Sequence, residues 1–109
     1  MKRIITYKQY FADFVEKLNS AEQQKLRKAL ALLKTEDRIP RHYVKFIRDK
    51  VFELRVTCPN TEIRVFFIYD GDTIVVLFNA FKKKTQKTPE QEIKKAIELK
   101  EEYYEAKRN

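Results

Sequence analysis

Three β-rich runs follow one another closely in the second half of the chain, and they constrain the fold more than any other feature. The runs cover residues 51–57, 62–69 and 73–81, and each is rich in β-branched and aromatic side chains. Cys58-Pro59-Asn60 separates the first two runs, and Asp70-Gly71 gives the Asp-Gly signal of a two-residue type I′ hairpin. Gly71 is the only glycine, and it lies in a turn of the kind that needs a positive φ. The runs predict an antiparallel meander.

Helical and strand patterns on either side of the meander predict the other elements. Residues 2–7 predict a first strand. Residues 7–18 carry apolar side chains at spacings of three and four, and a capping box of Ser20 and Gln23 begins a second helix that runs to about Leu33. Residues 35–48 predict an irregular connection. Thr88 as N-cap and Pro89 at the first helical position begin the last helix.

The order of these elements predicts an α+β fold. It has an N-terminal strand, a helical hairpin, a three-stranded antiparallel meander that completes a four-stranded sheet, and a C-terminal helix. A chain of 109 residues is the size of one domain, so we expect a single domain over residues 1–109.

Composition indicates the cellular compartment of the protein and whether it binds a metal or a cofactor. No apolar run is long enough to span a membrane, and the start of the chain lacks an apolar signal core. The single cysteine, Cys58, fits a reducing compartment. We therefore expect a cytoplasmic protein with no membrane partner. No residues have the spacing of metal ligands, so we also expect no metal and no cofactor.

The positive charge is concentrated in two segments. Residues 38–55 and 82–87 each carry a net charge of +4, which together equals the net charge of +8 of the whole chain. Such concentration favours binding to a polyanion such as RNA over the alternative, a generally lysine-rich solubilising surface. The residues expected to bind RNA are Arg41, Lys45, Arg48, Lys50, Lys82 and Lys87.

Alternation along the strands places a charged group on one face of the meander. Arg55 and Arg64 lie on the same side of neighbouring strands, with Glu53 beside them. If helices cover only the fully apolar face, both arginines project from an open face. The alternative is that they form ion pairs with Glu53 and Glu62.

Three motifs within this order of elements resemble the RelE/ParE superfamily of type II toxins, and most closely its HigB-like, phage-derived branch. The motifs are Glu53-Leu54-Arg55, Arg64-Val65-Phe66-Phe67 and the run from Phe81 through Lys82-Lys83-Lys84-Thr85-Gln86-Lys87-Thr88 to Pro89. The resemblance implies a ribosome-dependent endoribonuclease that cuts translated mRNA. It also implies neutralisation by a cognate antitoxin, often a helix-turn-helix protein of the HigA type. By the same resemblance, Arg64 matches an arginine of the third RelE strand, and Lys83 lies near one that follows the fourth.

Attack of a 2′-hydroxyl on the adjacent phosphate needs a base, cations and an acid. We expect Arg64 and Arg55 to grip the scissile phosphate, and Lys83 and Lys84 to stabilise charge or transfer protons. Like charges lower the pKa of a crowded lysine, so one of Lys82, Lys83 and Lys84 is a candidate base, and Glu53 is a second candidate. Two alternatives remain open: a ParE-like inhibitor of DNA gyrase, and a noncatalytic module that binds RNA or the ribosome.

Overall fold

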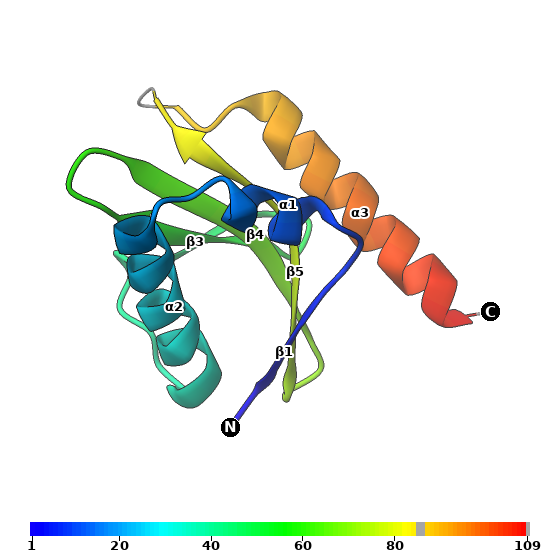
Figure 1. Cartoon of the computed structure of the whole chain (residues 1–109). Helices are drawn as coiled ribbons and strands as arrows, with labels where there is room; N and C mark the ends of the chain where they lie inside the picture. The colour runs from blue at the N-terminus through cyan, green and yellow to red at the C-terminus, as the bar shows by residue number, and fades with distance from the viewer. Residues whose placement is uncertain (85–86, 109) are drawn as a thin grey trace.

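A mixed five-stranded sheet forms the centre of the protein in the computed structural model, which describes residues 1–84 and 87–108 (Figure 1). The strand order is β1 (Arg3–Thr6), β5 (Ile74–Lys83), β4 (Glu62–Asp70), β3 (Val51–Thr57) and β2 (Val44–Arg48). β1 is parallel to β5, and every other neighbouring pair is antiparallel. The α+β class and the meander are confirmed, with one strand more than predicted.

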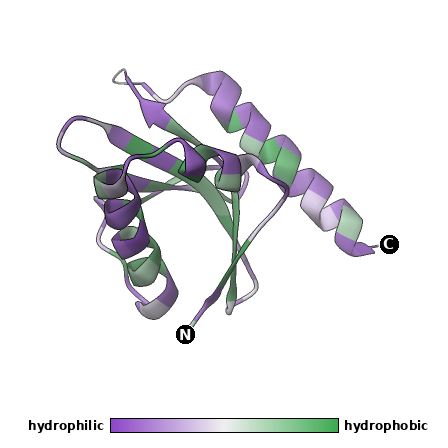
Figure 2. Ribbon diagram, viewed as in Figure 1, coloured by the Kyte–Doolittle hydropathy of each residue, from purple (hydrophilic) through white to green (hydrophobic). Residues whose placement is uncertain are grey.

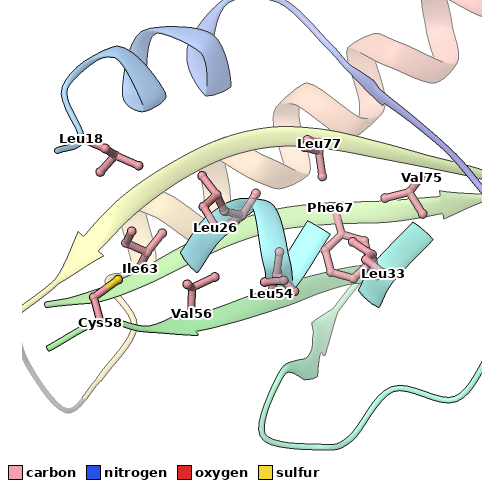
Figure 3. Close-up of a cluster of buried hydrophobic side chains, with 12 residues drawn as sticks. Leu18, Leu26, Leu33, Leu54, Val56, Cys58, Ile63, Phe67, Val75 and Leu77 are labelled. Carbon is pink, nitrogen blue, oxygen red and sulfur yellow. The ribbon is translucent and has the colours of Figure 1, made fainter. Parts of the chain in front are cut away.

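Helices cover both faces of this sheet. α1 (Tyr10–Glu16) and α2 (Ser20–Thr35) lie on one side and α3 (Glu90–Arg108) on the other, as Figure 1 shows. The first core, drawn in Figure 3, joins Leu26 and Leu33 of α2 to Leu54 and Phe67 of the sheet. The apolar stripe of α3 faces the sheet in Figure 2 and forms a second core against the opposite face. β5 is buried on both faces, as predicted for a central strand.

The second core corrects the expectation of an open face. Phe66 and Ile68 of β4 pack with Ile93, Ala96 and Leu99 of α3. An amphipathic helix must bury its apolar stripe, and the helical hairpin already occupies the first face. On this second face, a pocket opens at the end that lies beside the N-terminus of α3.

The additional strand lies in the segment that we expected to be irregular. β2 pairs antiparallel with β3, and the two-residue turn of Asp49 and Lys50 joins them. Both turn residues have positive φ, 51° and 67°, as a type I′ hairpin turn requires. The backbone carbonyl of Asp49 accepts a hydrogen bond of 2.7 Å from Lys100 Nζ, so α3 holds this turn in place.

Several local predictions differ from the structure by one residue. Asn19, not Ser20, caps α2, and its capping box uses Glu22 instead of Gln23. Gly71 has the expected positive φ of 68°, but Asp70 pairs with Ile74, so the loop has three residues instead of two.

No helix in the described part of the chain is long and apolar enough to cross a membrane. Thr85 and Gln86 of the lysine-rich motif lie outside the described residues.

Candidate functional site: a basic pocket beside the last helix

Charged side chains from four neighbouring strands meet on the face of the sheet that α3 partly covers. Residues paired across neighbouring strands point to the same side of a sheet. The pairs here are Lys45 with Glu53, Arg55 with Arg64, and Glu62 with Lys83. The fold therefore brings together Glu53, Arg55, Arg64 and Lys83, four of the five residues predicted to be catalytic.

A β-bulge in β5 determines which lysine joins them. Val65 pairs with Ala80 and Phe67 with Leu77, so Phe78 and Asn79 together oppose the single residue Phe66. Asn79 Nδ2 donates hydrogen bonds of 3.0 Å to both the backbone carbonyl and the side chain of Glu92 in α3. Strict alternation from Ile74 would place Lys82 and Lys84 on the α3 side. The extra residue places Lys83 there instead.

Glu53 lies at the centre of the charged group and has no solvent exposure. Arg55 Nε donates a hydrogen bond of 3.3 Å to Glu53 Oε1, and Arg64 Nε lies 3.7 Å from the same oxygen. The hydroxyl of Thr88 donates a hydrogen bond of 3.0 Å to Glu53 Oε2. Both carboxylate oxygens are therefore engaged. The geometry makes Glu53 an anchor for cations more than a base that reaches a substrate.

Arg64 is buried, in contrast to the predicted open position. Only 6% of the residue is exposed. Its Nη1 donates to the backbone carbonyl of Ile63 and lies within an ion-pair distance of Glu62 Oε1, both at 3.1 Å. Its Nε is buried without a hydrogen-bond partner. The ion pairs with Glu53 and Glu62 were the alternative that the sequence left open, and the structure contains both.

A pocket of about 360 Å³ opens beside this group, between β2, β3, the end of β5 and the start of α3. Its lining includes the cations Lys45, Arg55, Lys83 and Lys87 together with Thr88, and we call it the basic pocket. The pKa of Lys83 lies below its usual value, first because partial burial disfavours its charged form and then because Arg64 is close. The pocket thus combines concentrated positive charge with a lysine that loses its proton more readily than an ordinary one.

The other predicted residues lie outside this lining. Arg48 forms a two-pronged ion pair with Glu90 at the start of α3, and Lys82 pairs with Glu22 at 3.2 Å on the opposite face. Arg41, Lys50 and Lys84 are exposed. Lys84 follows the last residue of β5 and does not line the basic pocket.

The structure adds two residues that sequence reasoning did not assign to the site. We expected Thr88 to cap the last helix, but α3 begins at Glu90 and the Thr88 hydroxyl binds Glu53. Asn79 fixes the bulge, and a lone asparagine in an apolar strand was the only sign of it in the sequence. In the described residues, no group of three or more histidine, cysteine, aspartate or glutamate side chains is arranged to hold a metal ion.

Comparisons with known proteins give a family and a fold. A family model described as "Phage derived protein Gp49-like (DUF891)" matches residues 13–101. No curated protein matches the chain significantly. A chain in the crystal structure of the archaeal RelE-RelB complex from Pyrococcus horikoshii OT3 is similar, with a TM-score of 0.52 and 13% sequence identity. The match covers 79% of this chain and 98% of that chain, so the likeness is one of overall fold.

Proposed function

Since the chain belongs to the family of phage-derived Gp49-like proteins and its fold is similar to that of RelE, we propose that it is the toxin of a type II toxin–antitoxin system. We further propose that it acts as a ribosome-dependent mRNA endoribonuclease of the HigB-like branch. The observation that carries this proposal is the basic pocket, where four cations line a space beside a buried carboxylate.

The first requirement of the reaction is to bind and polarise a phosphodiester. Arg55 and Lys45 line the basic pocket and hold the scissile phosphate. A well-placed cation that meets the developing negative charge contributes on the order of 3 kcal/mol to transition-state stabilisation. Glu53 keeps the Arg55 guanidinium in a fixed orientation through their hydrogen bond. Because Arg64 is buried, it acts as a positioning residue for Glu53 instead of gripping the phosphate itself.

The second requirement is proton transfer. Unprotonated Lys83 removes the proton of the 2′-hydroxyl, whose oxygen then attacks the neighbouring phosphorus. The bond from phosphorus to the 5′-oxygen breaks, leaving a 2′,3′-cyclic phosphate on one fragment. A protonated lysine of the pocket wall, where Lys45 and Lys87 stand, supplies the proton to the leaving 5′-oxygen. Lys84 contributes only to the surrounding positive charge.

This acid–base set is weak, which explains a need for the ribosome. Lysine is a poor base near neutral pH even when its pKa is lowered, so much of the rate must come from substrate geometry. A ribosome that bends the mRNA at the decoding site supplies that geometry. We propose that the protein acts in the cytoplasm on mRNA held by the ribosome. A cognate antitoxin, of the helix-turn-helix, HigA-like kind, is its second partner; the similar RelE chain was solved as a complex with RelB.

Primer extension on cellular mRNA after induction tests the proposal. Wild-type protein is compared with Lys83→Gln and with Lys34→Gln, which removes the same charge from an exposed site near the end of α2. We expect cuts positioned relative to codons with the wild type and with Lys34→Gln, and none with Lys83→Gln. Circular dichroism of the purified variants confirms that each is folded.

The other outcomes identify the alternatives. Equal cleavage by all three proteins removes Lys83 from the mechanism. Intact mRNA together with blocked DNA supercoiling by the purified chain identifies a ParE-like gyrase inhibitor. Intact mRNA with growth inhibition and tight ribosome binding identifies a noncatalytic module.

A further inference from the structure

A second cavity lies around the edge of the sheet from the basic pocket. Its volume is about 320 Å³, and residues of α2, of the segment before β2 and of the end of β3 line it. We call it the edge pocket. It includes the only histidine of the chain, His42, which the proposed reaction does not use.

The lining of the edge pocket has the composition of a nucleotide site. Lys25 and Lys28 stand three residues apart on α2 and so lie on the same side of the helix. Ala29, Leu32 and Val56 add apolar surface, and the rings of His42 and Tyr43 lie 4.3 Å apart. The described residues that line the pocket include no carboxylate. Cations beside aromatic rings are the combination that binds single-stranded nucleic acid through phosphate contacts and base stacking.

Backbone hydrogen bonds hold the aromatic side of this pocket in place. Tyr43 N–H donates to the carbonyl of Pro40 at 2.9 Å, which closes a turn. The carbonyl of Tyr43 accepts from the backbone N–H of Arg55 at 2.6 Å. The Tyr43 backbone is therefore held beside the edge of β3 before any ligand binds, which lowers the entropy cost of binding.

Arg55 joins the two cavities, because it lines both of them. β2 begins only at Val44, so the part of β3 beyond Leu54 is paired with β4 alone, and Arg55 stands at this edge of the sheet beside Tyr43. Arg55 therefore lies between the two cavities, where a strand bound in one could continue into the other.

We infer that the edge pocket is a second RNA subsite, which binds a nucleotide neighbouring the scissile phosphate by contacts of Lys25 and Lys28 with phosphate and of Tyr43 with a base. The identification of the ligand as substrate RNA rests on the proposed nuclease function. The pocket itself is separate from the proton-transfer group at Lys83.

Fluorescence anisotropy tests this subsite with a labelled single-stranded decanucleotide of 2′-O-methyl RNA, which cannot be cut because its 2′-oxygen carries no proton. The charge variant is Lys25→Gln/Lys28→Gln. The matched control is Lys17→Gln/Lys34→Gln, which removes two exposed lysines outside both pockets. Tyr43→Leu removes the stacking ring.

We expect the charge variant to flatten the slope of log Kd against log salt by about 1.4, because each phosphate contact on a single strand contributes about 0.7. Tyr43→Leu weakens binding by about tenfold, the effect of losing one stacked base. The control keeps the wild-type slope. A charge variant that behaves like the control overturns the subsite. Polyglutamate that displaces the labelled RNA as well as unlabelled RNA does also overturns the subsite, and it identifies a site for an acidic polypeptide.

The same variants separate this inference from the proposed function. RNA binding that depends on Lys25 and Lys28, with no cleavage of ribosome-bound mRNA, contradicts the nuclease and leaves the subsite standing. If wild-type protein cleaves mRNA but the Lys25→Gln/Lys28→Gln variant binds RNA as the wild type does, the result contradicts the subsite alone.

Discussion

Glu53→Gln is the substitution whose effect on stability the structure predicts most sharply. The carboxylate has no solvent exposure and lies within 3.3 Å of Arg55 Nε and 3.7 Å of Arg64 Nε. The amide keeps the shape and removes the charge, so the buried guanidinium of Arg64 loses one of its two anionic partners. Breaking a buried ion pair by removing one partner costs about 3–5 kcal/mol.

The lower end of that range applies here, because Arg64 keeps its ion pair with Glu62 at 3.1 Å and Arg55 is partly exposed to water. We expect a loss of about 3 kcal/mol in the free energy of unfolding at neutral pH. In a domain of this size, such a loss lowers the melting temperature by about 15 °C. Urea unfolding followed by circular dichroism measures it.

Two comparison variants make the result decisive. Glu62→Gln removes a carboxylate whose side chain is 39% exposed, and it should cost about 1 kcal/mol or less. Glu53→Gln combined with Arg64→Met removes both buried charges and should be more stable than Glu53→Gln alone. Equal urea midpoints for Glu53→Gln and Glu62→Gln would refute the assignment of Glu53 as the buried anchor.

The remaining predictions concern proton transfer, a charged cluster and the bulge. The cleavage rate of the wild type should rise with pH up to a pKa below the usual 10.5 of lysine, because unprotonated Lys83 is the base; a pH–rate profile that is flat or falls with pH would contradict this role. Hydrogen bonds from Lys107 and Tyr103 lower the pKa of Asp70. Its contribution to stability is therefore present above the unfolded pKa of about 3.9 and is lost as pH falls through the lower folded value. Asp70→Asn should cost about 1–2 kcal/mol at pH 7 and progressively less toward pH 2, measured by thermal unfolding. Asn79→Ala removes two hydrogen bonds to α3 and should cost about 1–3 kcal/mol in urea unfolding, whereas an unchanged midpoint would show that the bulge forms without them.

The strands that carry the site could be predicted from the sequence because their pattern is strong. The boundaries of β3 were predicted without error, since residues 51–57 alternate clearly between two turns. Alternation also placed Arg55, Arg64 and Glu53 on a common face, and the positive φ of Gly71 followed from its being the only glycine.

Other parts of the site escaped prediction for identifiable physical reasons. β2 is a short edge strand in which no residue is fully buried, so it lacks an alternating pattern. The bulge at Phe78 and Asn79 was not predicted, and it shifts the alternation by one residue. The shift places Lys83, which was expected at the site, on the α3 side in place of Lys82 and Lys84. The sequence did contain a sign that Arg64 would be buried. Phe66 and Ile68 make the second face of β4 apolar, and such a face requires a covering helix.

Analysis of the RNA ends produced in a reconstituted reaction tests the central claim most directly. Purified ribosomes programmed with a defined mRNA are mixed with wild-type protein or Lys83→Gln, and the fragments are examined by mass spectrometry. We predict one codon-positioned cut that leaves a 2′,3′-cyclic phosphate and a 5′-hydroxyl with the wild type, and intact mRNA with Lys83→Gln. Intact mRNA with the wild type, or 5′-phosphate ends from hydrolysis by water, would contradict it.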